Sequence, residues 1–167
     1  MPRSFPDAGL RMKLSEIVQP ECIAVPLPSP DKQAAVFALA DLLLKHTPIA
    51  DGDELKQAIW SRETTRTTGI GHGIAIPHGK CAGVDTLRMA IGRCETPVDF
   101  DSIDGKPVEL IILLASPVDQ TGPHIQALAK VSRLLTDADF RDRVKAVETP
   151  TDLYDMIVAQ EAAQAAV

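Results

Sequence analysis

Aromatic residues are scarce in this sequence, and long apolar runs are absent. Phe, Trp and Tyr make up only 4% of the chain, so its core must consist mainly of Leu, Ile, Val and Ala. No apolar stretch approaches the roughly 18 residues that a membrane span requires. The opening residues do not have the pattern of a signal peptide. We therefore expect no membrane insertion.

Cysteine and positive charge are also in short supply. The three cysteines, Cys22, Cys81 and Cys94, are an odd number without C-x-x-C spacing, which indicates neither a disulfide framework nor a zinc knuckle. Reduced thiols are typical of the cytosol, so a cytoplasmic protein is the simplest interpretation. The net charge of −6 argues against nucleic acid or an anionic membrane as the main partner.

The spacing of apolar residues predicts one α/β domain. A chain of 167 residues with 45% hydrophobic content can bury a single core. The period predicts strands over 22–25, 87–91 and 108–115, and helices over 30–46, 53–63, 121–135, 138–144 and 150–158. The strand over 108–115 is apolar almost throughout, which suits a central strand covered on both faces. This order predicts a mixed β-sheet flanked by helices on both faces.

Prolines and caps suggest where these elements begin and end. Pro26 is expected to end the first strand, because proline cannot donate to a β-ladder. Ser29-Pro30 is expected to open the first long helix as N-cap and first helical residue. Asp51-Gly52-Asp53 is expected to form a turn and cap before the second helix, and Asp137 is expected to cap a later one. Either Thr149-Pro150 or Thr151 is expected to open the last helix.

The most distinctive stretch is residues 62–80, RETTRTTGIGHGIAIPHGK. Gly69, Gly71 and Gly73 alternate with other residues, which allows the backbone N–H groups to turn toward one point. A concave row of amides of this kind typically binds an anion, most often phosphate. A proline stiffens the backbone before His78, which we expect at the edge of a strand. The alternative is an ordinary surface loop that His78 caps.

Charged and polar residues elsewhere are candidates to complete an anion site. Arg62 lies at the expected end of a helix, where it would neutralise a doubly charged group or remain a solvated charge. His124 follows Gly122-Pro123 at a helix start, a position that favours anions. Its alternative is a plain surface histidine. Glu63 and Thr68 are weaker candidates.

Lys80 and His72 flank the candidate site, and a zinc site and a nucleotide-binding P-loop are the alternatives to it. Lys80 is expected at the rim, where a partner's charge would meet it, and His72 is interpreted as a loop residue. His72, His78 and His124 lack the helical spacing of a zinc site, so we predict no metal ligands. No G-K-[ST] follows the glycines, which excludes a nucleotide-binding P-loop, and we predict no cofactor.

Residues 68–78 match the signature TGIGxGIAIPH of the enzyme IIA proteins of the bacterial phosphotransferase system. The chain resembles the fructose/mannitol class of this family, especially its nitrogen-regulatory branch. Its one departure is His72, at a position where nitrogen-type members often have Asn. The resemblance covers roughly residues 13–160 and implies the family's mixed α/β architecture. Residues 1–12 are then a flexible N-terminal tail and residues 161–167 a C-terminal tail.

The resemblance also implies roles for individual residues. The family histidine that becomes phosphorylated maps to His78. Residues 124–128 match the family motif HxxxL, whose histidine helps to hold the phosphoryl group, so His124 would take that role. Arg62 resembles the arginine that neutralises the phosphate. The side of the His78 ring that does not attack needs a hydrogen bond, and a backbone carbonyl and a carboxylate are both suitable partners.

The implied function is that of a phosphoryl carrier. An HPr-like phosphohistidine protein would donate to His78, and the protein would act as a nitrogen-related regulator by binding transporters or sensor kinases. The sequence contains no IIB or membrane IIC segment, which favours this regulatory output. One alternative is a sugar-transport IIA component that passes the phosphoryl group to a separate IIB domain. The other is a non-catalytic regulatory binding module.

Overall fold

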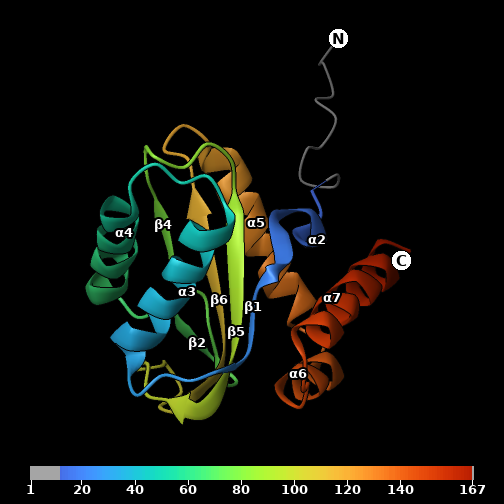
Figure 1. Cartoon of the computed structure of the whole chain (residues 1–167). Coiled ribbons are helices and arrows are strands. Elements are labelled where there is room, and N and C mark those ends of the chain that lie inside the picture. The colour runs from blue at the N-terminus through green and yellow to red at the C-terminus, as the bar shows by residue number, and fades with distance from the viewer. Residues whose placement is uncertain (1–11, 167) are drawn as a thin grey trace.

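The computed structural model describes residues 12–166, in which a mixed β-sheet carries helices on both faces (Figure 1). The elements follow in the order α2 (Leu14–Ile17), β1 (Val18–Leu27), α3 (Lys32–His46), α4 (Gly52–Thr65), β2 (Gly69–Gly71), β3 (Ile74–Ala75), β4 (His78–Lys80), β5 (Arg88–Val98), β6 (Val108–Ser116), α5 (Thr121–Leu134), α6 (Ala138–Lys145) and α7 (Pro150–Ala165). This arrangement confirms the predicted fold class. No helix within residues 12–166 combines the length and apolar character that crossing a membrane requires.

Strand β6 organises the sheet, whose strand order is β1-β5-β6-β3-β2 with β4 also paired to β6. β5 runs antiparallel to β6, whereas β3 and β4 run parallel to it. Alternate residues of β6 enter different cores: Leu110 and Ile112 face one, and Ile111 and Leu113 face the other. Burial of both faces explains the continuous apolar run and confirms the predicted central strand.

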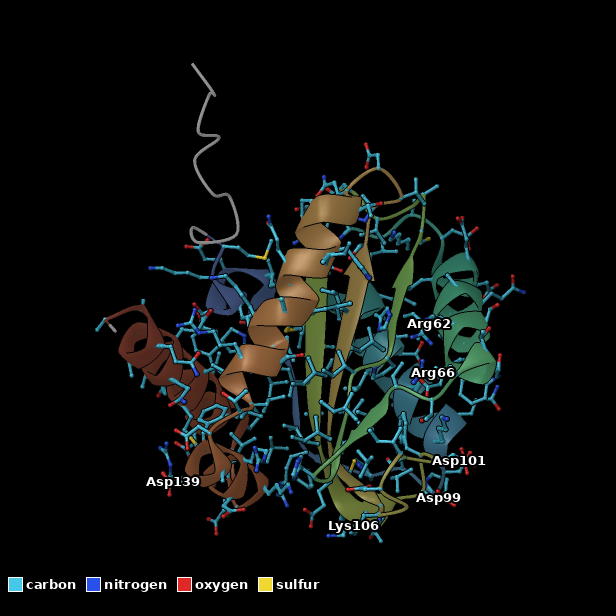
Figure 2. All side chains as sticks on the ribbon, turned by 180° about the vertical axis from the view of Figure 1, so that it is seen from behind. Arg62, Arg66, Asp99, Asp101, Lys106 and Asp139 are labelled. Atoms are coloured by element: carbon cyan, nitrogen blue, oxygen red, sulfur yellow. The ribbon has the colours of Figure 1, made fainter. Side chains whose placement is uncertain are left out.

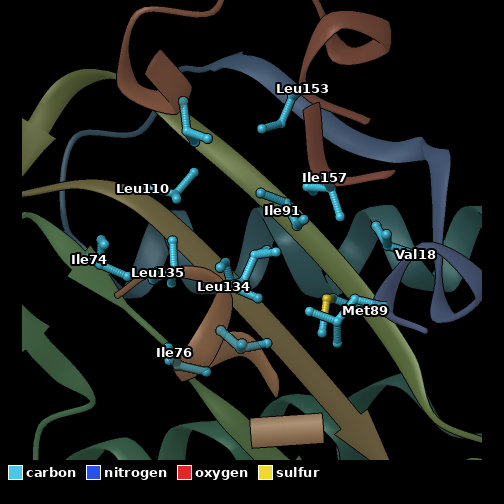
Figure 3. Close-up of a cluster of buried hydrophobic side chains, with 14 of the residues drawn as sticks. Val18, Ile74, Ile76, Met89, Ile91, Leu110, Leu134, Leu135, Leu153 and Ile157 are labelled. Carbon is cyan, nitrogen blue, oxygen red and sulfur yellow. The ribbon is translucent and has the colours of Figure 1, made fainter. Parts of the chain in front are cut away.

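Each face of the sheet is covered by its own set of helices. α3 and α4 pack on one face, and α5, α6 and α7 pack on the other with the short α2 (Figure 1). Figure 3 shows the core between the sheet and α5, α6 and α7, in which Leu134 and Leu135, at the end of α5, lie among strand residues such as Ile74 and Ile91. As expected from the composition, these cores consist mainly of aliphatic side chains.

The strands differ from the prediction at their ends. β1 begins at Val18 and includes Pro20 and Pro26, instead of spanning 22–25. Among the described residues it pairs only with β5, and proline is tolerated in such an edge strand because one side has no ladder to complete. β5 continues through Pro97, where a register shift interrupts its pairing with β6. Residues 69–75 contain the short strands β2 and β3 in place of the expected glycine loop, whereas β4 begins at His78, as expected.

The helix caps were largely predicted correctly. The side chains of Asp51, Asp137 and Thr149 accept hydrogen bonds from backbone amides at the starts of α4, α6 and α7. The prediction for α3 was wrong, because Asp31 is the N-cap and its carboxylate accepts from the Ala34 amide. Asp31 is a strong capping residue, and it lies two positions after Ser29.

Residues 161–166, which lie in the predicted C-terminal tail, make specific contacts with the rest of the fold. α7 continues to Ala165, and the Glu161 carboxylate accepts hydrogen bonds from the backbone amides of Leu14 and Ser15 at 2.6 and 3.0 Å. The Gln164 amide donates to the Arg133 carbonyl at 3.0 Å. The predicted N-terminal tail lies, apart from Met12, outside the described residues.

Candidate active site

His78 is the first residue of β4, which pairs in parallel with the end of β6. Its Nδ1 atom lies 2.8 Å from the Ile76 carbonyl oxygen, and because a carbonyl only accepts, Nδ1 must carry the proton. Nε2 has no hydrogen-bond partner among the described residues. The sequence left the orienting group open, and the structure identifies it as a backbone carbonyl. His78 therefore presents Nε2 as a free nucleophile.

His124, on α5, lies beside His78 with 5.3 Å between the ring centroids. It is buried, with 5% of its surface exposed, and its Nδ1 atom is 2.7 Å from the Ser116 hydroxyl oxygen. Burial, followed by the charges of His78 and Lys80, lowers the pKa of His124 to about 4. Burial also lowers the pKa of His78, where the nearby Arg62 acts in the same direction. Both rings are therefore neutral at neutral pH.

Arg62 lies in the last turn of α4, and its guanidinium donates to the Arg66 carbonyl oxygen at 2.9 Å. Figure 2 shows Arg62 and Arg66 together on the α4 side of the site. Both line an open cleft that His78 also lines. The remaining lining residues are Thr67, Thr68, Gly69, Ile70, Ile76, Ile103, Leu128 and Ser132. The cleft thus combines cationic groups with the free face of a histidine.

A buried ion pair holds the segment that enters this cleft. The Glu63 carboxylate, whose side chain is completely buried, lies 2.9 Å from the Lys32 ammonium group at the start of α3. It also accepts hydrogen bonds from the Thr68 amide, at 3.0 Å, and from the Thr68 hydroxyl. Glu63 therefore ties α3, α4 and the start of the glycine segment together. The sequence offered Glu63 only as a weaker candidate and did not indicate Lys32.

Several amides in and beside the alternating glycines already have side-chain partners, including that of Gly69. The Thr68, Gly69 and His72 amides donate to the side chains of Glu63, Thr67 and Asp104, respectively. Gly73 lies beside Glu109 and Lys145, and its carbonyl accepts from the amides of Glu109 and Leu110.

Gly71 and Gly73 instead serve the tight hairpin between β2 and β3. Their φ angles are +96° and +75°, and such conformations favour glycine. Along β6, the neighbouring Ile74 pairs with Leu110, whereas His78 pairs with Leu114. The structure therefore brings Thr68 and Gly69 to the cleft and separates Gly73 from His78.

Lys80 and His72 are both exposed, and neither is among the residues that line the cleft. Lys80 is exposed, and its ammonium group donates to the Thr121 hydroxyl at the start of α5 at 3.1 Å. His72 is an exposed turn residue with φ of 58° in the β2–β3 hairpin. Within residues 12–166, no three His, Cys, Asp or Glu side chains are arranged to hold a metal ion.

A neutral histidine with one free ring nitrogen, next to a second histidine and an arginine, suits a protein that holds an anionic group on histidine. The chain belongs to the family described as "Phosphoenolpyruvate-dependent sugar phosphotransferase system, EIIA 2", which matches residues 16–160. Members of this family take part in phosphoryl transfer between components of that system.

Known relatives include both regulatory and sugar-transport proteins. The chain is 33% identical to the nitrogen regulatory protein of Pseudomonas aeruginosa, over 88% of this chain and 96% of that protein. It is also 33% identical to the fructose-specific EIIABC component of Bacillus subtilis, over 87% of this chain but 23% of that protein. The crystal structure of the nitrogen regulatory protein IIA-Ntr from Neisseria meningitidis superposes with a TM-score of 0.80 at 29% identity, covering 86% of this chain and 97% of that one.

Proposed function

We propose that this protein accepts a phosphoryl group on His78 from an HPr-like phosphohistidine carrier and acts as a nitrogen-related regulator. The observation that supports the assignment is the state of His78. The Ile76 carbonyl accepts from Nδ1, Nε2 has no hydrogen-bond partner among the described residues, and His78 lines a cleft that Arg62 also lines. A neutral imidazole nitrogen is a competent nucleophile near pH 7 without a separate base.

Phosphoryl transfer from the donor histidine to His78 requires no proton to move between the two rings. The Nε2 lone pair of His78 attacks phosphorus as the bond between phosphorus and the donor ring nitrogen breaks, and that nitrogen keeps the electron pair. The donor ring, protonated on its other nitrogen, leaves as neutral imidazole. His78 becomes a phosphorylated imidazolium whose Nδ1–H still donates to the Ile76 carbonyl. This hydrogen bond strengthens as positive charge develops on the ring.

Arg62 and His124 are the groups that we assign to the phosphoryl oxygens. Arg62 uses one of its five N–H donors on the Arg66 carbonyl, so others remain for an anion. His124 is neutral and sits 5.3 Å from the His78 ring, within reach of a group carried on it. Thr68 and Gly69 shape the cleft wall. We do not retain Gly71 and Gly73 as phosphate-binding residues.

The regulatory output is favoured by the relative from Pseudomonas aeruginosa, a nitrogen regulatory protein that aligns along nearly its full length. Regulated transporters or sensor kinases would then be the partners. The second candidate, transfer to a separate IIB domain, is favoured by the Bacillus subtilis relative, which is named as fructose-specific EIIABC. Both functions use the same phosphorylated histidine.

The test is phosphorylation with a phosphorylated HPr-type donor, followed by mapping of the acid-labile phosphate. We expect label on the wild type and on His46→Ala, in which an exposed histidine is removed from the end of α3. We expect none on His78→Ala, and full labelling of that variant would disprove the assignment. Adding a purified fructose-class IIB domain to the labelled protein separates the two outputs, because only the transport function predicts rapid loss of label to it.

A further inference from the structure

Ser116 is the last residue of β6 and is fully buried, although serine is usually exposed. Its hydroxyl oxygen lies 2.7 Å from Nδ1 of His124, eight residues later on α5. Among the described residues, this ring nitrogen is the only hydrogen-bond partner of the hydroxyl. A buried polar group with a single partner constrains where that partner's proton lies.

The hydrogen bond between Ser116 and His124 can form in two ways, which differ in where the ring proton and the hydroxyl proton lie. If Nδ1 of His124 carried the proton, it would donate to the Ser116 oxygen, and the buried hydroxyl proton would have no acceptor. An unsatisfied buried donor is unfavourable, because it loses its hydrogen bond to water and gains none in the protein. If the hydroxyl donates to Nδ1, both groups are satisfied and the ring proton lies on Nε2. The second arrangement is therefore favoured.

We propose that Ser116 is a positioning residue that holds neutral His124 in the Nε2–H tautomer, so that this ring offers a hydrogen-bond donor to the phosphoryl group on His78. This inference rests on the proposed function of His78. Nε2 lies across the ring from Nδ1, on the side that does not contact Ser116. With the opposite tautomer, an Nε2 lone pair would meet the phosphoryl oxygens and repel them.

The two neighbouring histidines would then have complementary tautomers set by different partners. The Ile76 carbonyl accepts from His78 and leaves Nε2 as a lone pair. The Ser116 hydroxyl donates to His124 and leaves Nε2 as a donor. One ring is thus prepared to attack phosphorus and the other to bind its oxygens. Because burial keeps the pKa of His124 near 4, the ring has a single proton at neutral pH, and its position matters.

The direct test is the tautomer of His124, measured by long-range ¹H–¹⁵N NMR correlation and assigned with His124→Gln. We expect the Nε2–H tautomer in the wild type and a substantial Nδ1–H population in Ser116→Ala. Ser116→Thr keeps the hydroxyl and should restore the wild-type tautomer. The matched control is Ser102→Ala, because Ser102 is also buried but its hydroxyl has no partner in residues 12–166. Nδ1–H in the wild type, or no change in Ser116→Ala, would overturn the proposal.

A kinetic double-mutant cycle tests whether the tautomer matters for transfer. Ser116→Ala should slow phosphorylation of His78 about three- to tenfold, since part of a hydrogen bond to a charged group is lost. In a His124→Ala background, the same change should have no further effect. An equal loss in both backgrounds would mean that Ser116 has only a structural role. The NMR result needs no phosphoryl donor, so failure of the proposed function and failure of this inference remain distinguishable.

Discussion

At the scale of single residues, the role that we propose for Arg62 rests on a guanidinium whose hydrogen-bond donors are only partly used. Arg62 donates to the Arg66 carbonyl, and it lines a cleft that His78 also lines. A planar guanidinium binds two oxygens of a phosphoryl group at once, whereas an ammonium group acts as a point charge. Arg62 should therefore stabilise both the transition state and the phosphorylated product.

We predict that Arg62→Ala slows phosphorylation of His78 about ten- to a hundredfold, which corresponds to roughly 1.5–3 kcal/mol for a charged hydrogen bond. The phosphorylated protein should also lose its phosphate faster. Arg62→Lys keeps the charge and should recover part of the rate. The measurements are single-turnover transfer from a phosphorylated donor and the half-life of the phosphorylated product. A wild-type rate in Arg62→Ala would contradict the prediction and would mean that Arg62 is only a solvated charge at the end of its helix.

The low pKa of His124 makes stability depend on pH. As the pH falls below 6.5, the unfolded chain binds a proton at this residue, whereas the folded protein does not until about pH 4. The unfolded state binds more protons in this interval, so stability decreases as the pH falls. A difference of this size corresponds to at most about 3 kcal/mol, and burial of His78 adds a contribution of the same sign.

We predict that His124→Gln flattens the pH profile of stability between pH 6.5 and 4. Urea unfolding at several pH values gives the profile, and it requires no phosphoryl donor. His46→Gln, which changes an exposed histidine, should leave the slope as in the wild type. An unchanged slope in His124→Gln would show that His124 titrates equally in the folded and unfolded states.

At the scale of elements, the distance between α4 and β4 determines where Arg62 lies relative to His78. Gly79, the second residue of β4, makes their close approach possible. A Cβ atom at Gly79 would lie 3.0 Å from the Ile59 amide nitrogen and 3.1 Å from the Ala58 carbonyl carbon, both in the α4 backbone. Any side chain at this position must therefore push the helix away from the strand.

We predict that Gly79→Ala destabilises the protein by about 1–3 kcal/mol through overpacking. It should also slow phosphorylation of His78, because a shift of α4 carries Arg62 with it. The control is Gly122→Ala, since an added Cβ there meets no atom within 4 Å. Thermal unfolding and the transfer rate measure the two effects. If both variants match the wild type, α4 accommodates the methyl group without moving, and its spacing from β4 is not critical.

The elements also show what the sequence could and could not indicate. The apolar run that became β6 and the caps at Asp51, Asp137 and Thr149 are local signals, and they were predicted correctly. The engaged amides of the glycine segment were not predicted, because their acceptors come from residues up to 32 positions away. Ser116 had no signal beyond its place at the end of an apolar strand. Its role depends on how α5 packs back onto the sheet.

At the scale of the whole molecule, the site forms where helices from opposite faces of the sheet meet. Arg62 comes from α4 on one face and His124 from α5 on the other, with His78 on β4 between them. The two cores share the strands but not the helices, so each packs one of these two sides against the sheet. The sequence offered the three residues as candidates for one anion site, and the structure places β4, which pairs with β6, between the two helices.

The two ends of the described chain are also joined, and this contact is far from the site residues in sequence. α2 has no side-chain cap of its own at Lys13. The Glu161 carboxylate of α7 takes that place by accepting from the amides of Leu14 and Ser15, and the Tyr154 hydroxyl donates to the Ser15 carbonyl at 3.0 Å. Residue 161 therefore stabilises the start of the fold.

We predict that Glu161→Ala lowers the free energy of unfolding by about 1–3 kcal/mol, since it leaves two partly buried amides without their charged acceptor. Glu161→Gln retains one amide oxygen and should lose less. Deletion of residues 161–167 should lower the free energy of unfolding at least as much as Glu161→Ala, because the Gln164 contact with Arg133 is lost as well.

Glu148→Ala, at an exposed position before α7, is the matched control and should match the wild type. Urea unfolding measures each difference, and phosphorylation of His78 should stay at the wild-type rate in all four variants. Wild-type stability after the deletion would mean that the C-terminal residues form a tail after all.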